Sequence, residues 1–449
     1  MRIENRDGLA TTAARDTALS CVAAGIEAAL PERVVADHVD LADGTLTVAQ
    51  ASGDEDDGAN YDLDSFSTVR LVGAGKGSGR LAAALVDVLG GRVDSGVVVT
   101  DEPADAGPVD VLVGDHPVPT ERNVAAARRI RDCVADAPDD ALVVVALTGG
   151  ASALLTLPAG ECTVDDIADV TRELLDSGAA IAELNAVRKH CSAVKGGRLA
   201  SAAAPARLVT LAVSDVVGDD PSVVGSGPTA PDDTTYADAV AVLDRYDVTA
   251  PAVYEHLQRG VEGAAAETPR PDDPAFDRAD YHVVANAETA LSAAAAEATD
   301  RGYASLVLSR SIEGEAREAG RFHAAVAREV RSTGRPVEPP AVLLSGGECT
   351  VSVRGGGTGG PNLEFGLAAA LDLRGSDDVA VAAIDTDGRD GSTDAAGALV
   401  DGATVREEGA ARDALAANDS LGYLDGCGAV LRTGVTGTNV NDMRVVVVE

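Results

Sequence analysis

Short runs of Val, Leu and Ala alternate along this chain with longer stretches of helical periodicity. Such alternation is typical of parallel sheets covered by helices on both faces, because strands buried on both sides read as continuous apolar runs. The sequence therefore predicts an α/β fold. The expected strands are residues 68–74, 96–100, 109–114, 141–147, 207–213, 282–285, 305–309, 341–344, 350–353, 379–384 and 443–448.

Between these runs, helices are expected over residues 11–30, 78–89, 121–135 (with Thr120 as N-cap) and 313–332. Residues 50–64 and 260–280 read as loops. Glycine-rich loops fall into two sets, one before Thr229 and one after Val342. A chain of 449 residues has room for more than one domain. We expect two α/β domains with Rossmann-like, largely parallel or mixed sheets, spanning 1–235 and 236–449, and an interdomain active-site cleft.

Composition limits the partners. The net charge is -37, which argues against nucleic acid or an anionic membrane as a broad binding surface. The longest apolar run, residues 141–147, falls far short of the ~18 residues that a membrane helix needs. The N-terminus is polar and lacks the apolar core of a signal peptide. Six dispersed cysteines without a Cys-x-x-Cys pair predict no zinc site and a cytoplasmic location.

Lysine is scarce: three lysines stand against 33 arginines and 73 acidic residues. With 2% aromatic residues, this balance is typical of adaptation to molar salt, where carboxylates keep the surface hydrated and charge repulsion is screened. An acidic protein from a GC-rich genome is the alternative. In either case, Lys76, Lys189 and Lys195 lie beside glycine-rich or basic segments, which favours a chemical role for them.

Two glycine-rich loops directly follow predicted strands. In VGAGKGSGR, residues 72–80, Gly75 and its neighbours could bring backbone N–H groups to an anion that Lys76 also contacts. The loop matches neither the dinucleotide fingerprint nor the Walker phosphate loop, and a tight strand–helix turn is the alternative. In LTGGASALL, residues 147–155, the residues that could cradle a phosphate or carboxylate are Gly149, Gly150 and Ser152.

The segment LNAVRKHCSAVKGGRLA, residues 184–200, is the most concentrated cationic site in the chain. On one continuous helix, Asn185, Arg188, Ser192 and Lys195 would form a polar stripe, and Gly196–Gly197 would cap the helix end. An ordinary solvated basic face is the alternative. We expect the segment to hold anionic oxygens, with Lys189 among its contacts.

Several acidic and glycine-rich segments complete the candidates. Asp215 follows a predicted strand, where it could hold Mg²⁺ or accept a hydroxyl proton. Gly355–Gly360 could wrap a polyphosphate, or form a plain glycine loop. Asp385 and Asp387 lie in an acidic loop that fails the EF-hand spacing. Together these loops suit phosphoryl transfer, in which cations and amides neutralise and orient oxygens. A covalent hydrolase is less well supported because no Gly-x-Ser-x-Gly elbow is present.

These motifs also carry a family resemblance. The order of GAGKGSGR, GDHPVPTERN, TGGASALL, LNAVRKHCSAVKGGRLA, SDVVGDDPSVVGSGPTAPD, LLSGGECTV, DTDGRDGSTDAAGA and TGTNVNDM is similar to that of the type 2 glycerate kinase family with a MOFRL-type C-terminal domain. The resemblance covers residue 10 to the end. It implies ATP-dependent phosphorylation of D-glycerate, usually to 2-phosphoglycerate, with Mg²⁺ or another divalent cation, and the composition suggests a haloarchaeal member.

The resemblance places Lys76, Arg188 and Asp215 in catalytic roles, with Asp215, Asp385 and Asp387 as metal candidates. Pro361 and Leu363 depart from the Gly-Gly-Arg-Asn-Gln-Glu stretch of the family, so any role of its arginine is in doubt here. Substrate- or nucleotide-binding positions that it implies are Gly75, Gly149, Gly150, Ser152, Lys189, Lys195, Ser345, Gly346, Gly347, Glu348, Asn362 and Asn441, with Arg198 and Glu364 on matching motifs.

Two other functions stay open at this stage. An NAD(P)H-dependent hydroxypyruvate reductase would need a dinucleotide site, and the missing fingerprint counts against it. A non-catalytic protein that binds sugar acids would need only the cationic loops. Whether the 2- or the 3-hydroxyl of glycerate is phosphorylated is open, and a homodimer is one of the assemblies that the sequence allows.

Overall fold

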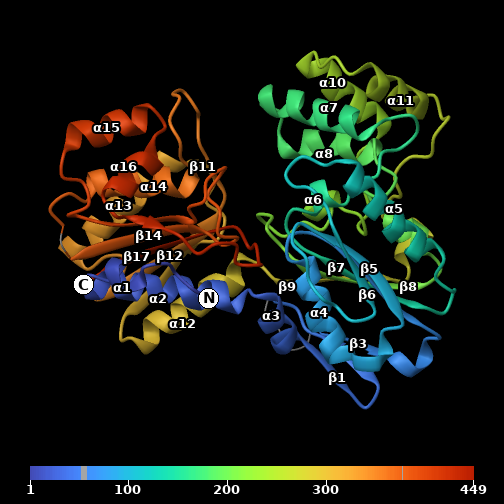
Figure 1. Cartoon of the computed structure of the whole chain (residues 1–449), viewed down its shortest axis with the longest axis horizontal. Helices are drawn as coiled ribbons and strands as arrows, with labels where there is room; N and C mark the ends of the chain where they lie inside the picture. Colours follow the sequence, from blue (N-terminus) through green and yellow to red (C-terminus); the bar gives the residue numbers. More distant parts are fainter. Residues whose placement is uncertain (52–57, 377) are drawn as a thin grey trace. The chain divides into compact units, whose positions relative to one another are not determined.

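The computed structural model describes residues 1–51, 58–376 and 378–449. Its contacts divide the chain into two compact units (Figure 1). The central unit is Val34–Val284, and the terminal unit combines Met1–Arg33 with Ala285–Glu449. This division differs from the expected boundary at 235/236, because the N-terminal helix packs against elements that follow residue 285.

The central unit contains a six-stranded sheet in the order β6-β5-β4-β7-β8-β9. From β6 to β8 all neighbouring strands are parallel, as the continuous apolar runs predict. The strands are β4 (Val69–Ala74), β5 (Ser95–Thr100), β6 (Val109–Val113), β7 (Leu142–Leu147), β8 (Arg207–Val213) and β9 (Ala279–Ala285).

Helices α4 (Ser78–Leu89) and α5 (Glu121–Ala135) have the predicted bounds, and the Thr120 side chain caps α5. The sequence did not foresee a separate helical cluster with its own apolar core (Figure 1). Its helices are α7 (Val164–Asp176), α8 (Ile181–His190), α10 (Tyr236–Tyr246) and α11 (Pro251–Val261). A small antiparallel sheet of β1 (Val39–Ala42), β2 (Thr45–Val48) and β3 (Ala59–Asp62) was also missed. Part of the acidic loop expected at 50–64, residues 52–57, lies outside the described residues.

The terminal unit has a mixed sheet in the order β10-β12-β17-β14-β15-β16. β10 and β12 are parallel, and the pairs from β12 to β16 are antiparallel. The strands are β10 (Ala304–Ser309), β12 (Ala341–Gly347), β14 (Val379–Asp385), β15 (Gly397–Asp401), β16 (Val430–Leu431) and β17 (Asp442–Val448). The strand expected at 350–353 is reduced to β13 (Cys349–Thr350), which pairs with β11 (Gly314–Glu315) outside this sheet.

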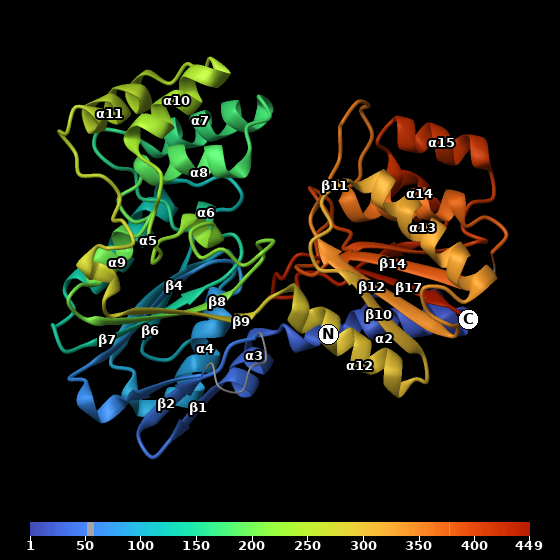
Figure 2. The same ribbon diagram turned by 180° about the vertical axis from the view of Figure 1, so that it is seen from behind.

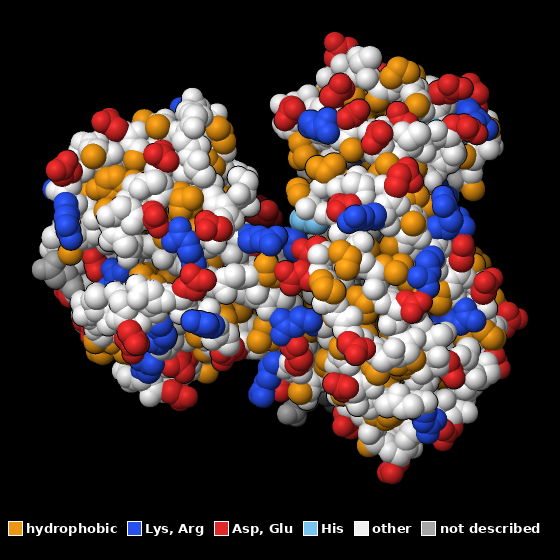
Figure 3. All heavy atoms as spheres, in the orientation of Figure 1, with side chains coloured by type: hydrophobic (Ala, Val, Ile, Leu, Met, Phe, Trp, Pro, Cys, Tyr) orange, Lys and Arg blue, Asp and Glu red, His pale blue; other side chains and the backbone are white. Residues whose placement is uncertain are grey.

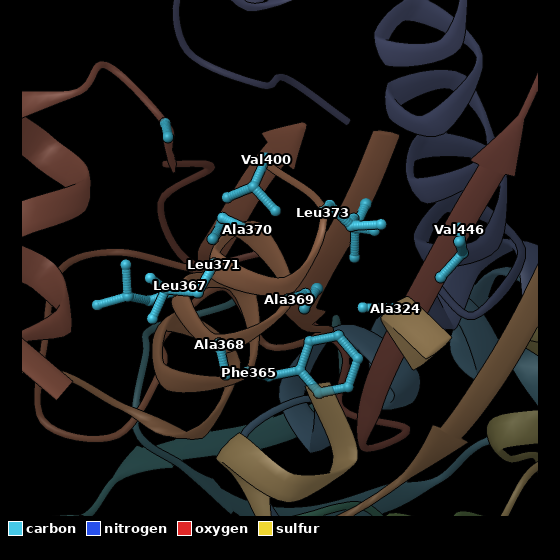
Figure 4. Packing of buried hydrophobic residues seen from close by; sticks show 14 of the residues in the cluster. Ala324, Phe365, Leu367, Ala368, Ala369, Ala370, Leu371, Leu373, Val400 and Val446 are labelled. Carbon is cyan, nitrogen blue, oxygen red and sulfur yellow. The ribbon is translucent and has the colours of Figure 1, made fainter. Parts of the chain in front are cut away.

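Helices cover both faces of this sheet. α2 (Ala13–Ala28) and α12 (Ala287–Asp300) pack side by side on one face (Figure 2). On the other face lie α13 (Ala316–Thr333) and α14 (Pro361–Asp372). Phe365 and its neighbours on α14 are buried from end to end of the helix, as the close view in Figure 4 shows. Consequently α14 is a core helix, and from Phe365 to Leu371 its sequence contains no polar side chain.

The face in Figure 3 shows carboxylates and arginines interspersed over both units, with no broad basic patch. Within the described residues, no helix combines the length and apolar character needed to cross a bilayer.

Candidate active site

The candidate site of the central unit lies where the strand order reverses. From β4 the sheet continues through β5 to β6 on one side and through β7 to β8 on the other. In α/β sheets, ligands bind at the carboxyl ends of strands at such a switch point. The loops after β4 and β7 meet there, and the Lys76 N–H donates to the carbonyl oxygen of Gly149 at 2.8 Å.

Glycine is required where these loops touch. A Cβ atom on Gly75 would lie 2.2 Å from Oγ1 of Thr148, and its φ of 131° disfavours any other residue. Gly150 has a φ of 83°, and a Cβ there would lie 3.0 Å from Cγ of Lys76 and 3.3 Å from the His116 ring. The side chains of Lys76 and His116 therefore lie directly over Gly150.

The loop after β4 differs from the expected backbone cradle. The N–H groups of residues 75–78 each donate to a protein acceptor: Gly75 to Val99, Lys76 to Gly149, Gly77 to the Thr148 hydroxyl and Ser78 to Gly75. These amides are used to hold the turn, so they are not open to an anion. The candidate ligand contact of this loop is therefore the side chain of Lys76 and not its backbone amides.

A cavity of about 360 Å³ opens beside these loops. Its lining includes the predicted residues Gly150, Ser152, Arg188, Ser192 and Lys195. It also includes residues that sequence reasoning did not single out, namely His116, Pro117, Val118, Pro119, Ile167, Ala168, Thr171 and Leu175. The signal for the first of these was the motif GDHPVPTERN. The residues of α7 could not be recognised from their own sequence, because only the fold brings this helix beside the cavity.

Two cations in this cavity lack a carboxylate partner. The ammonium of Lys195 donates to the carbonyl oxygens of Ser152 (2.8 Å) and Gly225 (3.4 Å), and no described carboxylate forms an ion pair with it or with Arg188. Burial, and then the charge of Arg188, lower the pKa of Lys195 to about 7. Burial also lowers the pKa of Arg188 to about 10. Since burial disfavours the charged form of both groups, an anionic ligand beside them would raise both pKa values again.

Lys189 has a different environment. Its ammonium pairs with Asp232 at 3.1 Å, and both side chains are buried. Asp232 also accepts from the hydroxyl of Thr268 and the N–H of Thr234. Lys189 is not among the residues that line the cavity, and the structure gives it a structural ion pair instead of the predicted ligand contact.

The predicted continuous helix over 184–200 is wrong. α8 ends at His190, because Ser192 forms a turn in which its hydroxyl accepts from the N–H groups of Val194 and Lys195. Gly196–Gly197 therefore does not cap α8; Gly197 instead precedes α9 (Arg198–Ala203). The turn still brings Ser192 and Lys195 to the same cavity as Arg188.

Other predicted residues of the central unit lie outside this lining, namely Gly75, Lys76, Gly149, Arg198 and Asp215. Arg198 donates to the Tyr236 hydroxyl and to the carbonyl oxygen of Ala266, both at 3.1 Å, and it lines a separate cavity. Asp215 is half-buried just after β8, which is the neighbour of β7 in the sheet. Its charge contributes to the raised pKa of Tyr281, whose main cause is burial.

In the terminal unit, the predicted loops gather at one sheet edge. β12 and β14 both end beside the start of β17, where Gly347 and Asp385 each pair with Asp442. Gly346 immediately precedes this end, and Asn441 lies just before β17 with a φ of 74°. Burial, and then the charges of Asp387 and Asp442, raise the pKa of Asp385. This edge is thus rich in carboxylates, whereas the edge in the central unit is cationic.

Most polar groups at this edge bind one another. The amide of Asn362 donates to Asp442 at 2.6 Å, and Arg444 pairs with Asp442 at 2.6 Å. Asp390 accepts from the N–H groups of Asn362 and Leu363, so it caps α14. These contacts explain why the positions are occupied by polar residues in an otherwise apolar unit.

The remaining predicted residues of this unit divide between structural and exposed positions. Ser345 is fully buried and hydrogen-bonds to His323 at 2.8 Å, and Glu364 binds Arg317 and Asn418. Glu348 is exposed. Pro361, where the family motif has arginine, begins α14.

The glycine loop Gly355–Gly360 is not an open cradle over most of its length. A Cβ on Gly355 or Gly357 would overlap the backbone of Ala417 or Asp419, and one on Gly360 would overlap Asp390. Glycine is needed at these positions because two backbones approach closely. Gly356 is different, with no atom within 4 Å of its would-be Cβ.

The described residues contain no group of three or more His, Cys, Asp or Glu side chains that could hold a metal ion. Mg²⁺ that arrives with a nucleotide takes several ligands from phosphates and water, and needs only one or two carboxylates. Asp385 and Asp387, whose charges repel each other at the sheet edge, fit that smaller requirement.

The switch-point loops and the cations Arg188 and Lys195 belong to an α/β protein whose central unit has a cavity suited to an anionic molecule. Comparison with known proteins identifies it further. Residues 17–258 match the model of a domain of unknown function (DUF4147), and residues 341–442 match the MOFRL family. The D-glycerate 2-kinase of Thermotoga maritima is 39% identical, covering 85% of this chain and 91% of its own. The glycerate 2-kinase of Pyrococcus horikoshii is 36% identical, covering 97% of each chain.

A relative from Agrobacterium vitis whose name includes hydroxypyruvate reductase is 46% identical over 84% of this chain and 86% of its own. The crystal structure of the glycerate kinase from Thermotoga maritima superimposes with a TM-score of 0.81 at 36% identity, covering 96% of this chain and 99% of that one. The chain belongs to the glycerate kinase family that combines DUF4147 and MOFRL domains.

Proposed function

We propose that this protein is a glycerate kinase that phosphorylates D-glycerate with ATP at the 2-hydroxyl. The pair Arg188 and Lys195 carries the proposal. Lys195 is buried and Arg188 is partly buried, and neither forms an ion pair with a carboxylate of the described residues, in a chain with a net charge of -37. Such a site is complementary to anionic oxygens, and both reactants are anions. The names of the Thermotoga and Pyrococcus relatives support the choice of reaction and of the 2-position.

In this reaction, the 2-hydroxyl oxygen of glycerate forms a bond to the γ-phosphorus as the bond to the β,γ-bridging oxygen breaks, and ADP leaves. The hydroxyl proton passes to a base, for which Asp215 at the end of β8 is our candidate. Lys76, over Gly150, and Arg188 hold oxygens that gain charge in the transition state. Mg²⁺ is proposed as the divalent cation, and it would neutralise phosphate charge when bound. The candidate ligands are Asp215 in the central unit and, separately, Asp385 and Asp387 in the terminal unit.

The test is incubation of the protein with D-glycerate, ATP, MgCl₂ and molar KCl. We expect ADP release that depends on glycerate, and a phosphorus NMR signal from 2-phosphoglycerate. A signal from 3-phosphoglycerate would overturn the assignment of the 2-hydroxyl as the phosphorylated group. ADP release that does not depend on glycerate would overturn the assignment of glycerate as the substrate. Omission of MgCl₂ with added chelator tests the need for the cation.

The name of the Agrobacterium relative makes hydroxypyruvate reduction the second candidate. It requires NAD(P)H oxidation with hydroxypyruvate in the absence of ATP. The loop after β4 argues against it: the third glycine of a dinucleotide fingerprint is Ser78, and the amides of residues 75–78 already have protein acceptors. We expect no change in absorbance at ~340 nm in that assay.

A further inference from the structure

We propose that the cavity of the central unit receives the nucleoside end of the nucleotide, with its phosphates directed to Arg188 and Lys195. The proposal rests on the kinase function and names which reactant the cavity takes. It assigns the base and ribose to an apolar wall formed by Pro117, Val118, Pro119, Ile167, Ala168 and Leu175.

The wall comes from two segments. Ile167, Ala168 and Leu175 lie on one face of α7, at positions i, i+1 and i+8, and the proline-rich segment 117–119 follows β6. Two of its side chains are open to water, because Val118 is 52% exposed and Leu175 is 56% exposed. α7 also contributes Thr171 and Arg172, so the wall is largely and not wholly apolar. A lining of this kind, in a chain with 73 acidic residues, marks a surface that a ligand covers.

Of the two reactants, only the nucleotide has an apolar part that could pack against this wall. Glycerate has three carbons, and each of them carries an oxygen, so it has no apolar group to bury. A nucleoside has a flat base that packs against proline and leucine side chains. The cavity volume of about 360 Å³ lies in the range of small-molecule sites, roughly 300–1,000 Å³. The ligand that uses both parts of the cavity is therefore apolar at one end and anionic at the other.

The cationic part of the lining suits a polyphosphate. Arg188 and Lys195 lie close enough for the charge of one to lower the pKa of the other, and no described carboxylate pairs with either. Two adjacent positive charges match a ligand with several negative ones better than a single carboxylate. The Ser152 hydroxyl, which hydrogen-bonds to the Ser226 hydroxyl at 3.0 Å, adds a polar contact beside them.

The decisive experiment reduces the space of the cavity beside the apolar wall. In Ala168→Phe, we expect KM for ATP to rise about tenfold or more with KM for glycerate unchanged, since the new ring occupies the space of the base. Ala241→Phe, at an exposed alanine of α10 outside the cavity lining, is the matched control. Leu175→Ser tests the same wall at an exposed position that folding does not require, and we expect a rise of about threefold in KM for ATP. Val261→Ser, at a 48% exposed residue of α11 outside this cavity, is its control.

Calorimetric titration with ADP, without glycerate, gives a second readout. Weaker ADP binding in Ala168→Phe and Leu175→Ser, but not in their controls, supports the proposal. A rise in KM for glycerate instead, or unchanged ATP and ADP constants in both wall variants, overturns it while leaving the kinase function standing. A wild-type protein that binds ADP at this wall but phosphorylates no glycerate would overturn the proposed function and leave the nucleotide site in place.

Discussion

The two units present opposite chemistry at their sheet edges. In the central unit, the edge at β4 and β7 leads to a cavity with the cations Arg188 and Lys195, neither of which pairs with a carboxylate in the part of the chain that the structure describes. In the terminal unit, the edge at β12, β14 and β17 is occupied by carboxylates that bind backbone amides, Asn362 and Arg444. Both edges carry glycine-rich loops, so glycine content alone does not distinguish a ligand site from a packing requirement. What distinguishes them is whether the charged side chains already bind a protein group of opposite charge.

The largest effect is expected from a lysine that does not face the cavity. Lys189→Met leaves Asp232 as a buried charge without its partner, which should lower the free energy of unfolding by about 3–5 kcal/mol. Urea unfolding in molar KCl measures this, and the double variant Lys189→Met/Asp232→Asn should recover part of the loss. We expect the folded Lys189→Met protein to keep most of its kcat/KM. A fall of about 100-fold, as expected for Lys195→Met, would contradict the assignment of a structural role to Lys189 and a ligand-binding role to Lys195.

Lys195→Met should show the reverse pattern. Removing the ammonium from the cavity should lower kcat/KM for ATP by about 100-fold, or ~2.7 kcal/mol, because transition-state oxygens lose a counter-charge. Stability should not fall, since burial already disfavours this charge. Steady-state kinetics and urea unfolding on the same sample separate the two effects. Near-normal kinetics would remove Lys195 from the site.

The glycine loops allow a third comparison. In Gly75→Ala the new Cβ would meet Thr148 at 2.2 Å, and the positive φ adds strain, so we expect a loss of about 1–3 kcal/mol in stability together with a loss of activity. Gly356→Ala, in the terminal unit, has open space around its Cβ and should leave both unchanged. Thermal unfolding and the kinase assay check the pair. If alanine were tolerated equally well at both positions, the close approach of Gly75 to Thr148 would be contradicted.

The last comparison concerns pH. The pKa of Lys195 is about 7 in the folded protein against 10.5 for an ordinary lysine, so between these values the unfolded chain binds a proton that the folded chain lacks. The stability of the wild type relative to Lys195→Met should therefore rise as the pH rises from about 7 towards 10.5. Affinity for ADP should fall over the same range as the ammonium loses its charge. A difference in stability that does not change with pH would show that Lys195 titrates normally.

The sequence predicted the strands well, because apolar runs such as 141–147 and 207–213 are long, β-branched and bounded by turns. It also identified the cationic segment at 188–198. It could not divide that segment, since the end of α8 at His190 depends on a hydrogen-bonded turn at Ser192, and the partner of Lys189 is 43 residues away. The cavity was not foreseen because its wall joins residues 117–119 to α7, which only the fold brings together. The roles of the site residues stay predictions.

The discontinuous make-up of the terminal unit has a consequence for synthesis on the ribosome. α2 emerges first, but the elements that bury it, α12, β14 and β17, are translated after the whole central unit. The guanidinium of Arg15 on α2 can pair with the carboxylate of Asp401 only after 386 further residues have been synthesised. The nascent chain must therefore keep an apolar helix unpaired while an entire domain is made, so we expect α2 to be the segment most in need of protection by a chaperone.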